Sequence, residues 1–151
     1  YCFIGILMLN SEMEYDSSIT DRCGTCRRCI DACPTQALDG RSMDARRCIS
    51  YQTIEIRASV EQEIRPLLSG CAVGCDICAE VCPWNKKWAK PHQHAELSAT
   101  KEILTWENKD WDELTVEKFK SVFRLSAIKR TGFSKLKENI SFLHQNKQAK
   151  N

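Results

Sequence analysis

The last part of the chain shows the clearest alternation of apolar and polar positions. Apolar residues recur at i, i+3, i+7 and i+10, opposite a basic side, and predict one helical stripe: Phe133, Leu136, Ile140 and Leu143. Gly132 interrupts the chain before this helix. Thr115 is a good N-cap for an earlier helix, whose apolar positions are Val116, Phe119, Val122 and Phe123. Residues 89–151 are therefore expected to form a small, basic helical region that begins with a polar connector.

The chain begins with its longest apolar run, which extends from Phe3 to Leu9. This run predicts a buried strand, and the alternation at Met13 and Tyr15 predicts its extension or a second strand. No strong strand follows nearby to pair with it. We therefore expect residues 1–19 to be the remnant of a preceding α/β domain, with Cys2 buried as a small apolar side chain. The run is too short to span a bilayer, and no membrane association is expected.

The middle of the chain predicts only short elements. A short helix is expected from Arg27 to Ala32, because Pro34 disfavours its continuation. Asp44 is a good N-cap for a helix that reaches Cys48 and Tyr51. The capping-box pattern Ser59-Val-Glu-Gln62 predicts another helix, with apolar residues on one side at Val60, Ile64, Leu67 and Leu68.

Length and composition limit these elements to a small protein. At 151 residues the chain forms one domain, or one small domain with an appendage, and 42% hydrophobic residues make a modest core. Ten cysteines are many for this length, yet the start of the sequence lacks the pattern of a secretory signal peptide. Such cysteines more often bind metal than form disulfides. We expect a cytoplasmic, monomeric protein whose metal centres supply much of the folding free energy.

The formal net charge of +2 conceals an asymmetry. Residues 118–151 carry nine Lys or Arg and one acidic residue, Glu138, which gives this segment a charge of +8. The preceding residues are therefore net acidic. A basic end of this kind favours a polyanionic partner, although a solvated helix face explains a run of charges equally well.

Two runs of cysteines carry the clearest chemical signal. The first has three cysteines at steps of three and a fourth after three spacers, followed by proline: Cys23, Cys26, Cys29 and Cys33-Pro34. The second repeats most of this pattern: Cys75, Cys78 and Cys82-Pro83. In bacterial two-cluster ferredoxins such runs hold 4Fe–4S clusters, and the fourth cysteine of a run binds the other cluster. We therefore predict an α+β, bacterial-type, two-cluster ferredoxin-like domain over residues 20–88.

The crossed pattern leaves one cluster ligand undecided. It assigns the first cluster to Cys23, Cys26, Cys29 and Cys82, and the second to Cys33, Cys75, Cys78 and one more cysteine. The repeat places that ligand at position 72, which is Ala72. The spacing favours Cys48, because Cys71 lies one residue out of register, but it leaves Cys71 open. Zinc sites use fewer cysteines at other spacings, and the expected compartment disfavours disulfides.

The chain shows no catalytic constellation of its own. His92, His94 and His144 lie in polar or terminal stretches without neighbouring acidic or thiol ligands, and no glycine-rich nucleotide-binding motif is present. Two clusters with crossed ligands form a one-electron relay, which needs an electron donor, such as a flavodoxin or ferredoxin, and an acceptor. On the cysteine pattern alone, a free-standing ferredoxin-type electron carrier is an alternative to a part of a larger enzyme.

Several motifs resemble those of the epoxyqueuosine reductase family. They are Asp21-Arg-Cys-Gly-Thr-Cys-Arg-Arg-Cys-Ile-Asp-Ala-Cys-Pro-Thr-Gln-Ala37, Arg47-Cys-Ile-Ser-Tyr51, Thr53-Ile-Glu55, Gly74-Cys-Asp-Ile-Cys78, Val81-Cys-Pro-Trp-Asn85 and Phe123-Arg-Leu-Ser-Ala-Ile-Lys-Arg130. The resemblance implies an oxidoreductase that uses cobalamin to remove the epoxide oxygen in the last step of queuosine synthesis in tRNA. The two clusters would supply the electrons. It also implies that Cys48 is the eighth cluster ligand.

The same resemblance implies two contact surfaces. Ser50, Cys75 and Asp76 would lie on the corrin side of the cluster domain and contribute to cobalamin binding. Lys129 and Arg130 would help to hold the tRNA anticodon stem-loop through its phosphates, by contacts that are sensitive to salt and carry no base specificity.

The sequence departs from the family pattern in two respects. The cobalamin domain, with its acidic proton donor, is absent from the sequence given. We therefore expect this chain alone to be inactive, as a fragment or as one half of a split enzyme. Leu125 also occupies a place where a small residue is expected.

Overall fold

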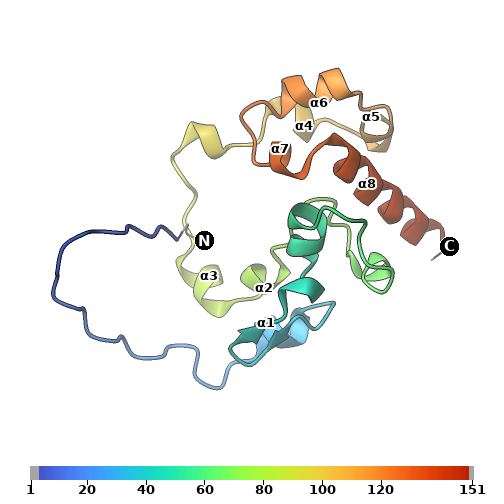
Figure 1. Cartoon of the computed structure of the whole chain (residues 1–151). Helices are drawn as coiled ribbons and strands as arrows, with labels where there is room; N and C mark the ends of the chain where they lie inside the picture. Colours follow the sequence, from blue (N-terminus) through green and yellow to red (C-terminus); the bar gives the residue numbers. More distant parts are fainter. Residues whose placement is uncertain (1–3, 150–151) are drawn as a thin grey trace.

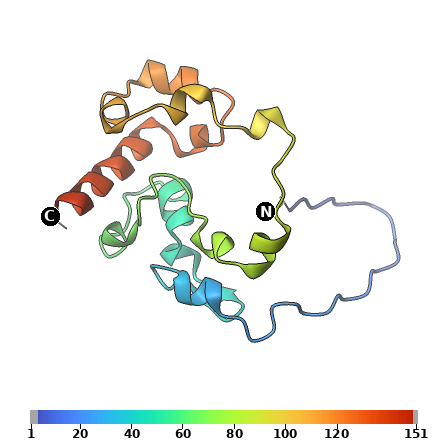
Figure 2. The ribbon, with the colours of Figure 1, turned by 180° about the vertical axis from the view of Figure 1, so that it is seen from behind.

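The computed structural model describes residues 4–149, which form three parts (Figure 1 and Figure 2). An irregular, extended segment comes first. A lobe of short helices and loops follows and ends with helix α3 (Pro83–Trp88). A helical lobe completes the chain, and its last helix lies beside the first lobe. Within residues 4–149 no helix is both long and apolar enough to cross a membrane.

The first lobe is built from short elements separated by loops. Before α3 these are α1 (Arg28–Ala32), β1 (Leu38–Asp39), β2 (Ser42–Met43), η1 (Ala45–Arg47), η2 (Tyr51–Glu55), η3 (Arg65–Leu67) and α2 (Ile77–Glu80). Helix α1 confirms the short helix expected there, and the backbone becomes extended at Cys33, as the following proline favours. β1 and β2 form an antiparallel hairpin, in whose turn Gly40 adopts a φ of +58°.

The segment after Asp44 departs from the single helix that the sequence predicts. Asp44 does act as an N-cap, because its carboxylate accepts the backbone N–H of Arg46 at 3.0 Å. Helix η1 nevertheless ends at Arg47, and the backbone of Cys48 is extended. The chain then becomes helical again and continues into η2, a π-helix that buries Gln52 and Thr53. π-helices are rare and occur often at functional sites, and this one follows Cys48 within a turn.

The helical lobe contains the remaining elements in the order expected. They are η4 (Ala95–Leu97), α4 (Lys101–Leu104), α5 (Asn108–Asp112), α6 (Val116–Val122), α7 (Ile128–Thr131) and α8 (Phe133–Gln148). Thr115 caps α6 by accepting the N–H of Lys118 at 3.2 Å. Gly132 separates α7 from α8 with a φ of +83°. Leu125 is exposed in the turn between α6 and α7.

Helix α8 takes part in two apolar cores. In the helical lobe it contributes Leu136 and Ile140, which pack with Leu114, Phe119 and Phe123. Toward the first lobe it contributes Phe142, which packs with Ile49, Val60, Ile64 and Leu68. The helix therefore joins the expected tail to the expected cluster domain, and the boundary between them near residue 88 stays a prediction.

The strand expected at the start of the chain is not formed in residues 4–9. This segment has no regular structure, and its side chains are exposed, from 56% for Leu9 to 92% for Met8. Met13 and Tyr15 are exposed as well. A strand needs a partner for its backbone N–H and carbonyl groups, and none lies beside this segment in the part of the chain that is described. Cys2 and Phe3 lie outside the described residues.

The capping-box pattern at Ser59 also does not produce an α-helix. Instead, the chain turns and then forms η3, a short 3-10 helix with Pro66 in its first turn. Pro66 has no backbone N–H to donate within a helix that begins at Ser59, and the side chain of Gln52 accepts the N–H of Glu61 at 3.1 Å. The expected apolar side is nonetheless buried at Val60, Ile64 and Leu68, while Leu67 is partly exposed.

Candidate functional site

The two cysteine runs lie against each other in the first lobe. Helix α1, which carries Cys29 of the first run, packs against α2, which carries Cys78 of the second (Figure 1). All nine cysteines among the described residues are free thiols, and none forms a disulfide. The sequence segments between the runs, including the β1–β2 hairpin and η2, therefore fold so that both sets of thiols belong to one region.

A long-range hydrogen bond joins the two ends of this cysteine framework. The indole Nε1 of Trp84, on α3, donates to the backbone carbonyl of Arg22 at 3.0 Å, although 62 residues separate them. Cys82 immediately precedes α3, and Cys23 immediately follows Arg22. The bond therefore brings these two cysteines toward the same end of the lobe, which fits a ligand set in which Cys82 completes the first cluster.

Asp21 organises the start of the first cysteine run. One carboxylate oxygen accepts the backbone N–H of Cys23 at 2.9 Å, and the other pairs with Arg41 on the hairpin. The hydrogen bond from Cys23 and, after it, the charge of Arg41 hold the pKa of Asp21 below its usual value. The carboxylate thus fixes the loop while the thiols of Cys23 and Cys26 stay exposed.

The last cysteine of the first run lies in a more polar setting. The Sγ atom of Cys33 accepts the backbone N–H of Ala37 at 3.3 Å and lies 3.6 Å from the hydroxyl oxygen of Thr35. Partial burial opposes ionisation of this thiol, but these hydrogen bonds together outweigh it and lower the pKa of Cys33. Such N–H···S and O–H···S contacts stabilise a thiolate, the form that binds iron.

The remaining thiols gather around Cys75. Burial is the main cause that raises the pKa of Cys75, and the neighbouring thiols of Cys71 and Cys48 raise it further. Burial likewise raises the pKa of Cys78, with additional contributions from Cys75 and Cys48, and it raises that of Cys71. Both candidates for the missing ligand, Cys48 and Cys71, therefore lie near Cys75. A positively charged iron centre reverses these effects and favours the thiolates.

The donor set has the chemistry of iron–sulfur clusters. Free cysteine thiols come from two runs whose helices α1 and α2 pack against each other. A 4Fe–4S cubane is larger than one ion, and its four cysteine ligands stand around it. Soft thiolates from two facing loops are the ligands that such a cluster uses. The residues present therefore fit two clusters.

A network of buried polar groups surrounds the second group of cysteines. The Thr53 hydroxyl, in η2, donates to the Ile49 carbonyl at 2.7 Å and accepts the N–H of Gly74, next to Cys75, at 3.0 Å. Asn139 of α8 donates to the carbonyls of Thr53, at 3.0 Å, and Ala72, at 2.8 Å. The helical lobe therefore reaches the loops that carry the cysteines.

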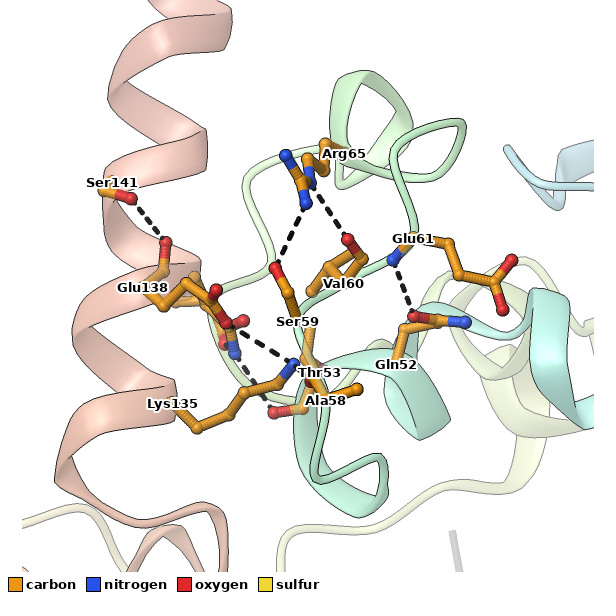
Figure 3. A network of polar contacts seen from close by, with 12 residues as sticks. Gln52, Thr53, Ala58, Ser59, Val60, Glu61, Arg65, Lys135, Glu138 and Ser141 are labelled. Atoms are coloured by element: carbon orange, nitrogen blue, oxygen red, sulfur yellow. Dashed lines mark hydrogen bonds and ion pairs between the residues drawn. The ribbon is translucent and has the colours of Figure 1, made fainter.

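Further contacts hold α8 against the first lobe (Figure 3). The ammonium of Lys135 donates to the Ala58 carbonyl at 2.6 Å. Arg65 donates to the carbonyl of Val60 and the hydroxyl of Ser59, and its guanidinium lies 4.4 Å above the ring of Phe142. These bonds fix the loop that leads from η2 to η3.

The residues expected on the corrin side lie on adjacent segments. Ser50 directly precedes η2, and Cys75 and Asp76 directly precede α2. The bond from Gly74 to Thr53 joins these two segments. Asp76 is exposed and makes no capping bond to α2. The structure therefore places the three residues near one another, while their role in cobalamin binding stays a prediction.

The residues expected to contact nucleic acid lie on α7 and are exposed. Arg130 forms an ion pair with Glu55, at the end of η2, with 2.5 Å between Nη2 and Oε2. Lys129 lies next to it on the surface. His144, one of the three histidines, lies on α8, where its Nδ1 is 3.4 Å from Oδ1 of Asp112. The basic surface of α7 thus borders the helix that follows Cys48.

Sequence reasoning missed three residues of this site. Thr53 and Trp84 fall in motifs that resemble the family, but their contacts were not predicted, because these contacts are with residues far along the chain. Asn139 did give a signal that was not used. It falls between Leu136 and Ile140 on the apolar stripe of α8, where a buried polar side chain needs a specific partner.

A comparison with protein-family models defines the class of the first lobe. Residues 22–85 match the model described as a 4Fe-4S double cluster binding domain. This range includes all of the cysteines expected as ligands. The first lobe is therefore a ferredoxin-like domain for two 4Fe–4S clusters, with short helices and a small sheet.

Curated relatives extend the match to nearly the whole chain. Epoxyqueuosine reductase from Cellulophaga algicola is 44% identical over 144 residues, which are 95% of this chain and 47% of the relative. The enzyme of the same name from Leadbetterella byssophila is 41% identical over 96% of this chain and 47% of its own length. That from Escherichia coli is 34% identical over 93% and 37%. This chain belongs to the epoxyqueuosine reductase family, and it spans about half or less of the length of these relatives.

Solved structures agree with this assignment. Epoxyqueuosine reductase from Bacillus subtilis matches with a TM-score of 0.78 and 33% identity, over 91% of this chain and 37% of that one. The structure from Streptococcus thermophilus matches with a TM-score of 0.71 and 34% identity, over 91% and 36%. A further epoxyqueuosine reductase structure, with a TM-score of 0.78, 33% identity and the same coverage, contains an epoxyqueuosine-modified tRNA-Tyr stem loop. The family resemblance seen in the cysteine and tail motifs is thus confirmed.

Proposed function

We propose that this chain is the electron-relay part of an epoxyqueuosine reductase. Its two 4Fe–4S clusters would pass electrons to cobalamin for the reduction of epoxyqueuosine to queuosine in tRNA. Family membership supports the activity. The hydrogen bond between Trp84 and Arg22 is the observation that best supports the relay. It brings the two ends of the cysteine framework together, as crossed ligands require.

Eight thiolates would hold the two clusters. The first set is Cys23, Cys26, Cys29 and Cys82, and the second is Cys33, Cys48, Cys75 and Cys78. When bound, the clusters supply one-electron transfer. The chain's own groups orient the ligands. Ala37 and Thr35 stabilise the Cys33 thiolate, and Asp21 holds the turn at Cys23.

The corrin side of the domain would be formed by Ser50, Cys75 and Asp76. Support comes from their position on two segments joined by the bond between Gly74 and Thr53. The exposed carboxylate of Asp76 is free to receive a hydrogen bond from a bound cofactor. Because Cys75 would belong to the second cluster, this arrangement makes that cluster the exit of the relay.

The anticodon stem-loop of tRNA would contact α7 through Lys129 and Arg130. The charge of the basic end of the chain supports this proposal, as does the presence of a tRNA stem loop in a solved relative. The ion pair with Glu55 holds Arg130 near η2 in the free protein. A phosphate would have to compete with that carboxylate for the guanidinium.

Electron transfer by the reduced chain tests the proposed relay. The reduced protein is mixed with cobalamin without oxygen, and the absorbance of the clusters and of cobalamin is followed. We expect the clusters to be reoxidised as cobalamin is reduced, and we expect Cys75→Ser to react much more slowly. Equal rates for the two proteins would contradict a relay that leaves through the second cluster.

A free-standing ferredoxin-type carrier is the competing function. The matches to epoxyqueuosine reductases include the helical lobe as well as the cluster domain, since they cover more than 90% of this chain. A simple carrier does not need a basic helical lobe. We therefore favour the enzyme part, in the cytoplasm, as a monomer supplied by a flavodoxin or ferredoxin. Binding of the chain to a tRNA anticodon stem-loop separates the two functions.

A further inference from the structure

Asn139 is a buried amide on the otherwise apolar side of α8, with 0% of its surface exposed. Its two donated hydrogen bonds reach the carbonyls of Thr53 and Ala72, which are 86 and 67 residues away. Thr53 belongs to the segment that carries Cys48, and Ala72 to the loop that carries Cys75. One side chain from the helical lobe therefore spans the two segments.

The hydroxyl of Thr53 also links these two segments. It donates to the carbonyl of Ile49, the residue after Cys48, and it accepts the N–H of Gly74, the residue before Cys75. A continuous set of hydrogen bonds thus runs from the neighbour of one cysteine to the neighbour of the other.

Apolar packing alone does not fix the separation between the segments that carry Cys48 and Cys75. The core between α8 and the first lobe consists of aliphatic side chains and Phe142, with Cys71, Cys75 and Leu143 partly buried against it, and such contacts are non-directional. Hydrogen bonds are directional and become stronger where water is excluded. The bonds made by Asn139 and Thr53 therefore determine a geometry that the surrounding core tolerates but does not specify.

We propose that Asn139, acting through Thr53, is a positioning residue for the second cluster. It sets the separation of Cys48 and Cys75 and thereby controls the assembly and the reduction potential of that cluster selectively. The inference rests on the proposed assignment of Cys48 and Cys75 as its ligands. Hydrogen bonds next to metal ligands orient them and tune the metal. The first run of cysteines is held separately, by Asp21 and Trp84.

The test uses the whole chain, loaded with iron and sulfide. Asn139→Leu removes both donors at similar volume. Thr53→Val removes the hydroxyl at nearly the same shape, whereas Thr53→Ser keeps it. The matched control is Asn146→Leu, because Asn146 also lies on α8 but donates to the carbonyl of Arg65 at 2.6 Å, which belongs to neither the segment from Cys48 to Thr53 nor the loop from Ala72 to Cys75.

Iron content, the EPR spectrum of the reduced protein and the potentials of the two clusters are measured. We expect Asn139→Leu and Thr53→Val to lose up to half of the iron and to approach the spectrum of Cys75→Ser, which is expected to retain the first cluster only. Where the iron is retained, the potential of one cluster shifts and that of the other does not. Thr53→Ser and Asn146→Leu are expected to match the unaltered chain.

Three results overturn the positioning role: equal loss from both clusters, unchanged iron and potentials in both variants, or the same effect in Asn146→Leu. If Asn139→Leu does not fold, the comparison of Thr53→Val with Thr53→Ser decides. Cys48→Ser and Cys75→Ser are measured alongside. If these two keep all of their iron, the ligand assignment fails, which is distinguishable from failure of the positioning role alone.

Discussion

The guanidinium of Arg130 pairs with the carboxylate of Glu55 across the two lobes, with 2.5 Å between Nη2 and Oε2. Arg130 belongs to the basic surface of α7, and Glu55 ends the π-helix that follows Cys48. Both side chains are substantially exposed, and exposed ion pairs are weak and sensitive to salt. A phosphate that approaches α7 is therefore able to take Arg130 from Glu55.

The double substitution Lys129→Ala/Arg130→Ala is expected to weaken binding of a tRNA anticodon stem-loop. Each phosphate contact that is lost should also flatten the dependence of log affinity on log salt concentration by about 0.7–0.9. Fluorescence anisotropy at several salt concentrations measures both effects. The double variant Lys101→Ala/Lys109→Ala, on α4 and α5, is the control, because it also removes two exposed positive charges. Binding and salt dependence that match those of the unaltered chain would refute the role of α7.

Removing the competing carboxylate should have the opposite effect. In Glu55→Gln the guanidinium of Arg130 loses its charged partner, so we expect the stem-loop to bind a few-fold more tightly. The gain should disappear when Arg130→Ala is added, because the two residues then act through the same contact. A gain that persists in the double variant would show that Glu55 acts by general repulsion of the nucleic acid.

The fourth ligand of the second cluster is decided by two single substitutions. Cys48→Ser is expected to lose about half of the iron, since a 4Fe–4S cluster normally needs all four thiolates. Cys71→Ser should retain its iron, although Cys71 lies near Cys75. Iron and sulfide analysis of the two purified variants gives the answer. The reverse pattern would assign the ligand to Cys71.

The sequence predicted the parts of the molecule whose information is local. Pro34 after Cys33 marks the end of α1, Thr115 caps α6, and the apolar stripe from Phe133 marks α8. Each of these depends on residues within a few positions of one another. The ferredoxin-like class followed in the same way from cysteine spacing, and it is supported by the match over residues 22–85.

The parts that were missed depend on contacts between distant residues. The helix expected from Ser59 does not form, because Pro66 has no backbone N–H to donate within it, and the segment is instead held to Gln52 through the N–H of Glu61. The placement of α8 against the first lobe depends on Asn139 and Phe142, which no local pattern assigns to that partner. The strand expected at the start needs a partner that the described residues do not contain.

The sharing of α8 between two cores predicts that the lobes unfold together. Phe142 is 7% exposed and packs in the first lobe, so Phe142→Ala should reduce the free energy of unfolding by about 3–5 kcal/mol. The control is Leu125→Ala, because Leu125 is 84% exposed, and it should change stability by less than about 0.5 kcal/mol. Urea unfolding is followed by far-UV circular dichroism and by cluster absorbance. Two separated transitions in the unaltered chain would contradict the prediction that the lobes unfold together.

The lowered pKa of Lys135 predicts that the free energy of unfolding rises toward alkaline pH. Burial lowers the pKa of this lysine below its ordinary value of 10.5, despite an opposing contribution from the Glu138 carboxylate; the charge of Arg65 lowers it further. The unfolded chain therefore holds the proton more tightly than the folded chain, and the free energy of unfolding increases as the pH rises toward 10.5.

The substitution Lys135→Gln isolates this effect. Glutamine keeps a donor for the Ala58 carbonyl, which Lys135 reaches at 2.6 Å, but it does not titrate. The urea midpoint of the unaltered chain should therefore rise relative to that of Lys135→Gln between neutral and alkaline pH, while the titration of other groups acts on both proteins and cancels in the difference. A difference that is constant or falls with pH would mean that the ammonium of Lys135 is stabilised in the folded chain, and that its bond to the loop before η3 outweighs the cost of burial.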